Sequence, residues 1–77
     1  MQVVFHNLED IEKFMNLCSK YESDVIVNNG SIYVDANSLI ALVSLGFNTP
    51  FDITFANKKD GEYESFVIEM DKLGLRG

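Results

Sequence analysis

Two runs rich in β-branched and aromatic residues, DVIV at 24–27 and SIYV at 31–34, are separated only by Asn28, Asn29 and Gly30. An Asn-Gly step between such runs is the strongest short-range signal for a β-hairpin, because both residues tolerate the positive φ angles of a tight turn. The hairpin joins two neighbouring strands into one antiparallel pair. Every other element must therefore be arranged around a sheet that contains this pair.

Strand and helix patterns alternate on both sides of the hairpin. Strands are expected at 2–6 and at 51–56, where Phe51, Ile53 and Phe55 alternate with Asp52, Thr54 and Ala56. Helices are expected from a cap at Asn7, from a cap at Asn37 or Ser38, and after a charged turn at 57–61. The inner stripe of the first helix should contain Leu8, Ile11, Phe14, Met15, Cys18 and Tyr21, and that of the last should contain Tyr63, Phe66, Val67, Met70 and Leu73.

The resulting order is β-α-β-β-α-β-α within one domain that spans residues 1–77. Four short strands and three helices can bury each other in two layers, so we expect an α+β open-faced sandwich. Its four-stranded sheet should be mainly antiparallel, with all three helices on one face. Ferredoxin-like folds share the β-α-β-β-α-β part of this order. A ferredoxin-like small-molecule sensor would have no packed helix after residue 61.

The charge and the cysteine content exclude several classes of function. The net charge is −6 and the six basic residues are scattered, which opposes binding to nucleic acid or to an anionic membrane. One cysteine, Cys18, allows neither an intrachain disulfide nor a cysteine-based zinc site, and we expect it in the core. No apolar run is long enough to span a membrane and no segment resembles a signal peptide, so we expect a cytoplasmic protein.

The segment DANSLIALVSLGF, followed by FDITF, resembles HPr, the small phosphocarrier protein of the bacterial sugar phosphotransferase system. HPr of the firmicute type has a lysine-serine pair, a short apolar helix, a serine-leucine-glycine turn and then a strand. Here these positions are occupied by Asn37-Ser38, residues 39–43, residues 44–46 and residues 53–55. The resemblance covers roughly residues 8–73 and implies the HPr-like form of the open-faced sandwich.

The phosphoryl-accepting histidine of HPr is missing from the matching position. Asn7 occupies the histidine position and Glu9 occupies that of the arginine that steadies the phosphoryl group. Glu9 and Asp10 also place negative charge at this helix start, which opposes a phosphate there. The only histidine, His6, lies one residue earlier and is the candidate for a shifted phosphoryl acceptor.

Two features of the HPr-like segment remain as functional candidates. Ser38 matches the serine that HPr kinase phosphorylates, and it is also a good helix N-cap. The helix that follows is apolar on all sides, although only one stripe of it can face the sheet. We expect Leu42 and Leu45 in the core, whereas Leu39, Ile40 and Val43, with Phe47 beyond the helix, should form an exposed partner-binding surface.

These observations predict an HPr-like regulatory or protein-interaction module that does not perform histidine phosphotransfer. The resemblance implies protein partners, namely phosphotransferase-system enzymes, HPr kinase or a transcription regulator. No cofactor or metal is expected, and no arrangement of catalytic side chains indicates an enzyme. Two alternatives stay open: a phosphocarrier that accepts a phosphoryl group on His6 from enzyme I, and the ferredoxin-like sensor.

Overall fold

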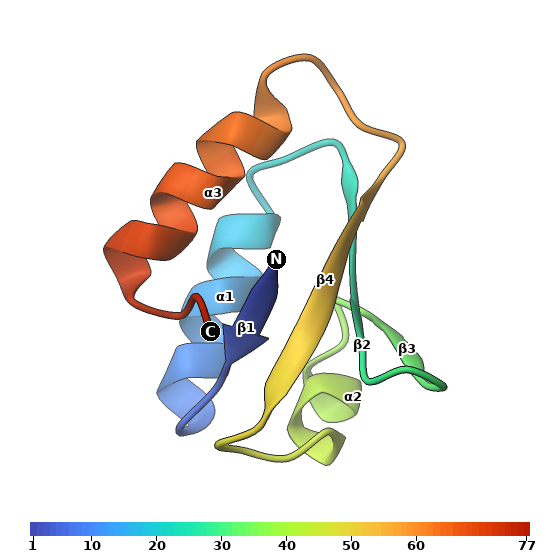
Figure 1. Cartoon of the computed structure of the whole chain (residues 1–77), viewed down its shortest axis with the longest axis vertical. Helices are drawn as coiled ribbons and strands as arrows, with labels where there is room; N and C mark the ends of the chain where they lie inside the picture. Colours follow the sequence, from blue (N-terminus) through green and yellow to red (C-terminus); the bar gives the residue numbers. More distant parts are fainter.

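The computed structural model describes all 77 residues and has the element order expected from the sequence. The strands are β1 (Gln2–Val4), β2 (Asp24–Asn28), β3 (Tyr33–Asp35) and β4 (Pro50–Ala56), and the helices are α1 (Leu8–Cys18), α2 (Leu39–Ser44) and α3 (Glu62–Leu73). Figure 1 shows the helices beside one sheet whose strand order is β1-β4-β2-β3. All three strand pairings are antiparallel. The four-stranded α+β fold predicted from the sequence is therefore confirmed.

The sheet is apolar on one face only. Its register brings Val3 opposite Phe51, Val25 opposite Phe55, and Val27 opposite both Ile53 and Val34. Of these side chains only Ile53 is not fully buried, and it packs against the core. The alternate positions include Gln2, Asp24, Tyr33, Asp52 and Thr54, which are exposed. Because side chains alternate along a strand, one face contacts the helices and the other is open.

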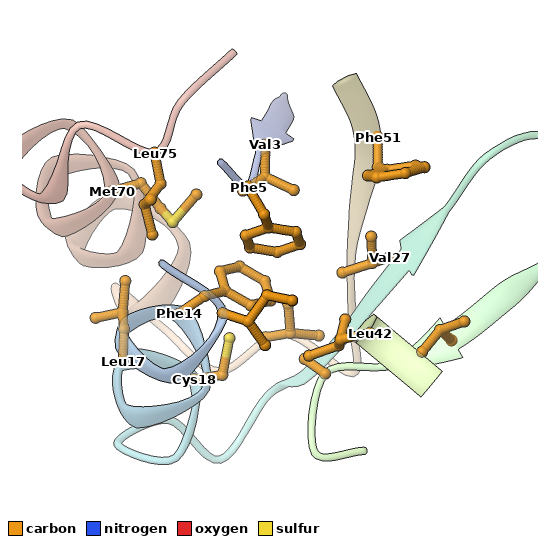
Figure 2. Close-up of a cluster of buried hydrophobic side chains, with 14 of the residues drawn as sticks. Val3, Phe5, Phe14, Leu17, Cys18, Val27, Leu42, Phe51, Met70 and Leu75 are labelled. Atoms are coloured by element: carbon orange, nitrogen blue, oxygen red, sulfur yellow. The ribbon is translucent and has the colours of Figure 1, made fainter. Parts of the chain in front are cut away.

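The core lies between this apolar face and the helices. Phe5 and Phe14 meet edge-to-face, with ring centroids 5.2 Å apart, and Phe14 contacts Phe66 of α3 in the same way. Figure 2 shows the rings of Phe5 and Phe14 at the centre, with Leu42 on one side and Met70 on the other. Each helix therefore contributes at least one fully buried side chain to the same cluster, as a domain of this size requires.

Helix α3 is fixed to the rest of the fold by its first residue. The carboxylate of Glu62 accepts hydrogen bonds from the Ser23 hydroxyl (2.6 Å), from the backbone N–H of Ser23 (2.9 Å) and from that of Glu22. These bonds hold the pKa of Glu62 below its ordinary value, with the Ser23 hydroxyl as the largest cause. Phe66 and Met70 of α3 are fully buried. The ferredoxin-like alternative predicts no packed helix here, so α3 argues against it.

Three elements are shorter than the sequence pattern predicts, and one of them is β3, which begins at Tyr33 instead of at residue 31. The strand expected at 2–6 ends at Val4, because the backbone C=O of Phe5 accepts from Asn48 N–H (2.7 Å) instead of pairing within the sheet. The first helix ends at Cys18 rather than near Tyr21, which is only partly buried. Leu8 and Leu73, both expected on inner stripes, are exposed, whereas Leu17 and Leu75 belong to the core.

The last three residues lie along the free edge of β1. Val4 N–H donates to Leu75 C=O (2.9 Å), Gly77 N–H donates to Gln2 C=O (3.0 Å), and Val3 pairs with Arg76 in an antiparallel bridge. Leu75 is buried at the same place. The edge of β1 is thus covered by the chain itself, which removes a row of unpaired backbone groups. No helix in the structure has the length and apolar character of a membrane span.

Candidate functional site

Helix α2 begins with the serine that the sequence singled out. The Ser38 hydroxyl accepts from the backbone N–H of Ala41 (3.4 Å), and the N–H of Ser38 donates to Asp35 C=O (3.1 Å). Ser38, not Asn37, is therefore the N-cap, and its side chain is half-buried. The helix ends where Gly46 takes a φ of 95°, a left-handed conformation that favours glycine. The predicted cap and the predicted stop are both confirmed.

Only one side chain of α2 is fully buried. Leu42 has no exposed surface, and Leu45 packs partly against the core, as predicted. The opposite side of the segment is uncovered, and Ile40 is 84% exposed. The surface that we call the α2 patch consists of Leu39 (42% exposed), Ile40, Val43 (39%) and Phe47 (39%). The prediction that these side chains face outward is confirmed, and their role in binding stays a prediction.

The start of α1 is organised by two polar side chains. Asn7 Oδ1 accepts from the backbone N–H of Asp10 (2.9 Å), so Asn7 is the N-cap that the sequence predicts. Asp10 Oδ2 accepts from the backbone N–H of His6 (2.9 Å) and lies 3.4 Å from His6 Nδ1. The His6 ring is 60% exposed, whereas Glu9 pairs with Lys13 at 3.4 Å. The group that meets His6 Nδ1 is therefore a carboxylate, which would repel a phosphoryl group rather than neutralise it.

The start of α1 and the end of the α2 patch lie in the same region of the molecule. Asn48, which directly follows Phe47, donates its backbone N–H to Phe5 C=O, one residue before His6. Figure 1 shows the start of α1, helix α2 and the loop into β4 together at the lower end of the view. The structure therefore brings the matching positions of the HPr-like resemblance, Asn7 and Glu9, to the same region as the end of the α2 patch.

The side of α1 that faces α2 carries an exposed leucine that the sequence pattern placed in the core. Leu8 is 47% exposed, and Glu12 is exposed and takes part in no ion pair. Leu8, Glu12, Met15 and Ser19 follow each other at helical spacing on one side of α1. The sequence pattern assigned Leu8 to the core stripe, because the first helical position has the same spacing as the buried ones. No residue close to Leu8 in the sequence indicates that this position lies outside the core.

A hollow of about 310 Å³ lies between the end of α1 and the start of α2. Its lining includes Cys18, Ser19, Asp24, Asp35 and Asn37. The Cys18 thiol is buried as predicted, and burial, with the nearby Asp35 carboxylate as a second cause, raises its pKa to about 12. A thiol with so high a pKa is no nucleophile at neutral pH. The hollow therefore offers polar groups but no reactive one.

No three His, Cys, Asp or Glu side chains come close enough together to hold a metal ion. Comparison with protein-family models, with curated proteins and with solved structures found no match for this chain.

Proposed function

We propose that this protein is an HPr-like regulatory module that docks onto protein partners through the α2 patch and does not transfer phosphate on a histidine. The observation that carries the proposal is the exposure of the α2 patch, above all of Ile40 at 84%. Four large apolar side chains in one segment of nine residues are costly to leave in water, and such clusters usually mark contact surfaces. The cytoplasmic partners would be phosphotransferase-system enzymes, HPr kinase or a transcription regulator.

The start of α1 supports the second half of the proposal. Asn7 uses its side chain to cap the helix, and Glu9 pairs with Lys13. The amide of Asn7 cannot carry a phosphoryl group as an imidazole does. The carboxylates of Glu9 and Asp10 also lie where the resemblance places an arginine and a proline, so an incoming phosphate would meet like charge.

Ser38 is the proposed regulatory site, because it stands immediately before the first residue of the α2 patch. A phosphate there would add about −1.5 to −2 charges beside Leu39 and Ile40. The Ser38 hydroxyl acts only as a hydrogen-bond acceptor at 3.4 Å, and its side chain is half-buried rather than enclosed. Modification would therefore change the charge beside the docking surface without unfolding the core.

A phosphocarrier that uses His6 is the second candidate, and the exposure of its ring favours it. Asp10 Oδ2 lies 3.4 Å from Nδ1 and would fix the ring, leaving Nε2 directed away from this carboxylate. Incubation with phosphoenolpyruvate and enzyme I, followed by intact mass, separates the two candidates. The regulatory module should gain no phosphate. A stoichiometric acid-labile phosphate that disappears in His6→Ala would show the phosphocarrier instead.

The docking role is tested by titrating the labelled protein with purified enzyme I and with HPr kinase. Ile40→Ser should weaken binding, and Ile68→Ser is the matched control, because Ile68 is an exposed isoleucine on α3 (56%). Treatment with HPr kinase and ATP tests Ser38, with Ser44→Ala as the control at the opposite end of α2. The proposal fails if neither protein binds, or if both isoleucine variants weaken binding equally.

A further inference from the structure

The α2 patch lies in a long stretch of chain that carries no positive side chain. No lysine or arginine occurs between Lys20 and Lys58, and the same stretch contains the acids Glu22, Asp24, Asp35 and Asp52. Asp35 ends β3, just before α2, and takes part in no ion pair. The loops on both sides of the α2 patch therefore contribute negative charge or none.

The lysines of α1 lie on the side of that helix away from α2. Lys13 and Lys20 line a small hollow together with Glu69 and Leu73 of α3, so they face α3. Ser19 and Cys18 line the hollow that leads to Ala36 and α2, so they face the other way. Figure 2 agrees, since Leu17 lies on the Met70 side of α1 and Cys18 lies on the Leu42 side. The two sides of α1 thus differ in charge.

The side of α1 that faces α2 also exposes apolar side chains and carries no positive charge. Leu8, Glu12 and Met15 precede Ser19 at helical spacing and lie on its side of the helix. Leu8 adds a half-exposed aliphatic side chain, and the exposed carboxylate of Glu12 makes no ion pair. The α2 patch is therefore an apolar surface with a carboxylate on its α1 side and another, Asp35, at the start of α2.

We propose that the partner of the α2 patch is a protein surface with an apolar centre and lysine or arginine side chains at its edge. Such a surface would bury Ile40 and Val43 while its cations meet the carboxylates of Glu12 and Asp35. Neither carboxylate takes part in an ion pair, and that of Asp35 accepts only from the backbone N–H of Asn37 (2.8 Å). A second copy of this chain is a poor occupant, because its own acids would meet the same acids across the contact. The inference rests on the docking role proposed above and specifies the chemistry of what docks.

The test uses a synthetic amphipathic helical peptide of leucine and lysine, and a matched peptide with glutamate in place of every lysine. Binding of the labelled peptides to the full chain is measured by fluorescence anisotropy at low and at high salt. The lysine peptide should bind and weaken with salt, whereas the glutamate peptide should not bind. Ile40→Ser should weaken binding of the lysine peptide about fivefold or more, because it removes the most exposed side chain of the α2 patch from the contact.

Charge reversal provides the second arm of the test. Glu12→Lys should weaken binding of the lysine peptide by about threefold, which is typical for one charge at the edge of an interface. Glu64→Lys, an equal charge change at an exposed position on α3, and Ile68→Ser should both leave binding unchanged. Equal losses in Glu12→Lys and Glu64→Lys would mean general attraction to an acidic protein and would overturn the proposal.

Two other outcomes would also overturn it. If the glutamate peptide bound more tightly than the lysine peptide, the charge assigned to the partner would be reversed. If sedimentation showed self-association that depends on Ile40, the occupant of the α2 patch would be a second copy of the chain. The outcome of the peptide test can be distinguished from the outcome of the test of the proposed function. If enzyme I or HPr kinase binds through Ile40 but the lysine peptide does not, the docking role stands and this inference fails. If only the lysine peptide binds through Ile40, the inference stands and the phosphotransferase-system role fails.

Discussion

Leu42 is the one fully buried side chain of helix α2, so truncating it should be far more costly than truncating Ile40 two residues earlier. Leu42 has no exposed surface and belongs to the central cluster, whereas Ile40 is 84% exposed. Leu42→Ala removes buried methyl groups and leaves a cavity, which costs about 3 kcal/mol of unfolding free energy. Ile40→Ala loses little burial and gains helix propensity, so its change should stay within about 0.5 kcal/mol.

These magnitudes are large compared with the whole stability of such a domain. For a chain of this length the free energy of unfolding is roughly 4 to 12 kcal/mol. With a urea dependence of about 1 kcal/mol per molar for a small protein, Leu42→Ala should lower the unfolding midpoint by about 2 to 3 M. The midpoint of Ile40→Ala should change by less than about 0.5 M.

Equilibrium unfolding in urea, followed by far-ultraviolet circular dichroism, measures both variants. If Leu42→Ala is unfolded without denaturant, Leu42→Met serves in its place, and this volume-conserving change should cost less than about 1.5 kcal/mol. Equal midpoint shifts for the alanine variants of Leu42 and Ile40 would refute the reasoning. They would mean that the outer side of α2 is stabilised by contacts within the chain, and the α2 patch would not be free for a partner.

Three other side chains give further tests. The pKa of Glu62 is lowered by the Ser23 hydroxyl, so its contribution to stability is present above the unfolded pKa and is lost as the pH falls through the folded pKa. Glu62→Gln should therefore lower the urea midpoint at neutral pH, and the difference from the native chain should shrink in acid. Ser38→Ala should cost about 1 kcal/mol in urea unfolding through the lost N-cap, whereas Ser38→Asp should retain most of it. Because burial raises the pKa of Cys18 to about 12, a thiol reagent should label it only in denaturant, and rapid labelling of the folded chain would contradict this.

The elements that the sequence predicted well are those with strong local signals. The hairpin between β2 and β3 is confirmed, although residues 29–32 form its loop and only Gly30 in it takes a positive φ (100°). Ser38 and Gly46 mark the two ends of α2 as predicted. The division of α2 into a buried Leu42 and an exposed Ile40 also followed from the sequence, because a short helix can turn only one stripe toward a sheet. Local rules suffice where the deciding contacts lie within a few residues.

The sequence predictions are wrong where contacts between residues far apart in the chain determine the structure. The first strand ends early because Asn48, more than forty positions away, takes the C=O of Phe5. After Cys18 the N–H groups of Lys20 and Tyr21 bond only three residues back, and those of Glu22 and Ser23 bond the distant carboxylate of Glu62, so the chain leaves the helix before Tyr21.

The pairing of residues 75–77 with β1 has a consequence for how the fold would respond to force. Residues 75–77 run antiparallel to β1, so Gln2 and Gly77 lie at the same end of the pair. A load applied between the two ends of the chain would pull the strands apart sideways, and their hydrogen bonds would break one after another instead of sharing the load. The Gly77–Gln2 bond would open first and the Val4–Leu75 bond second. Stretched in this direction, the domain should yield at low force, beginning with the peeling of its last three residues.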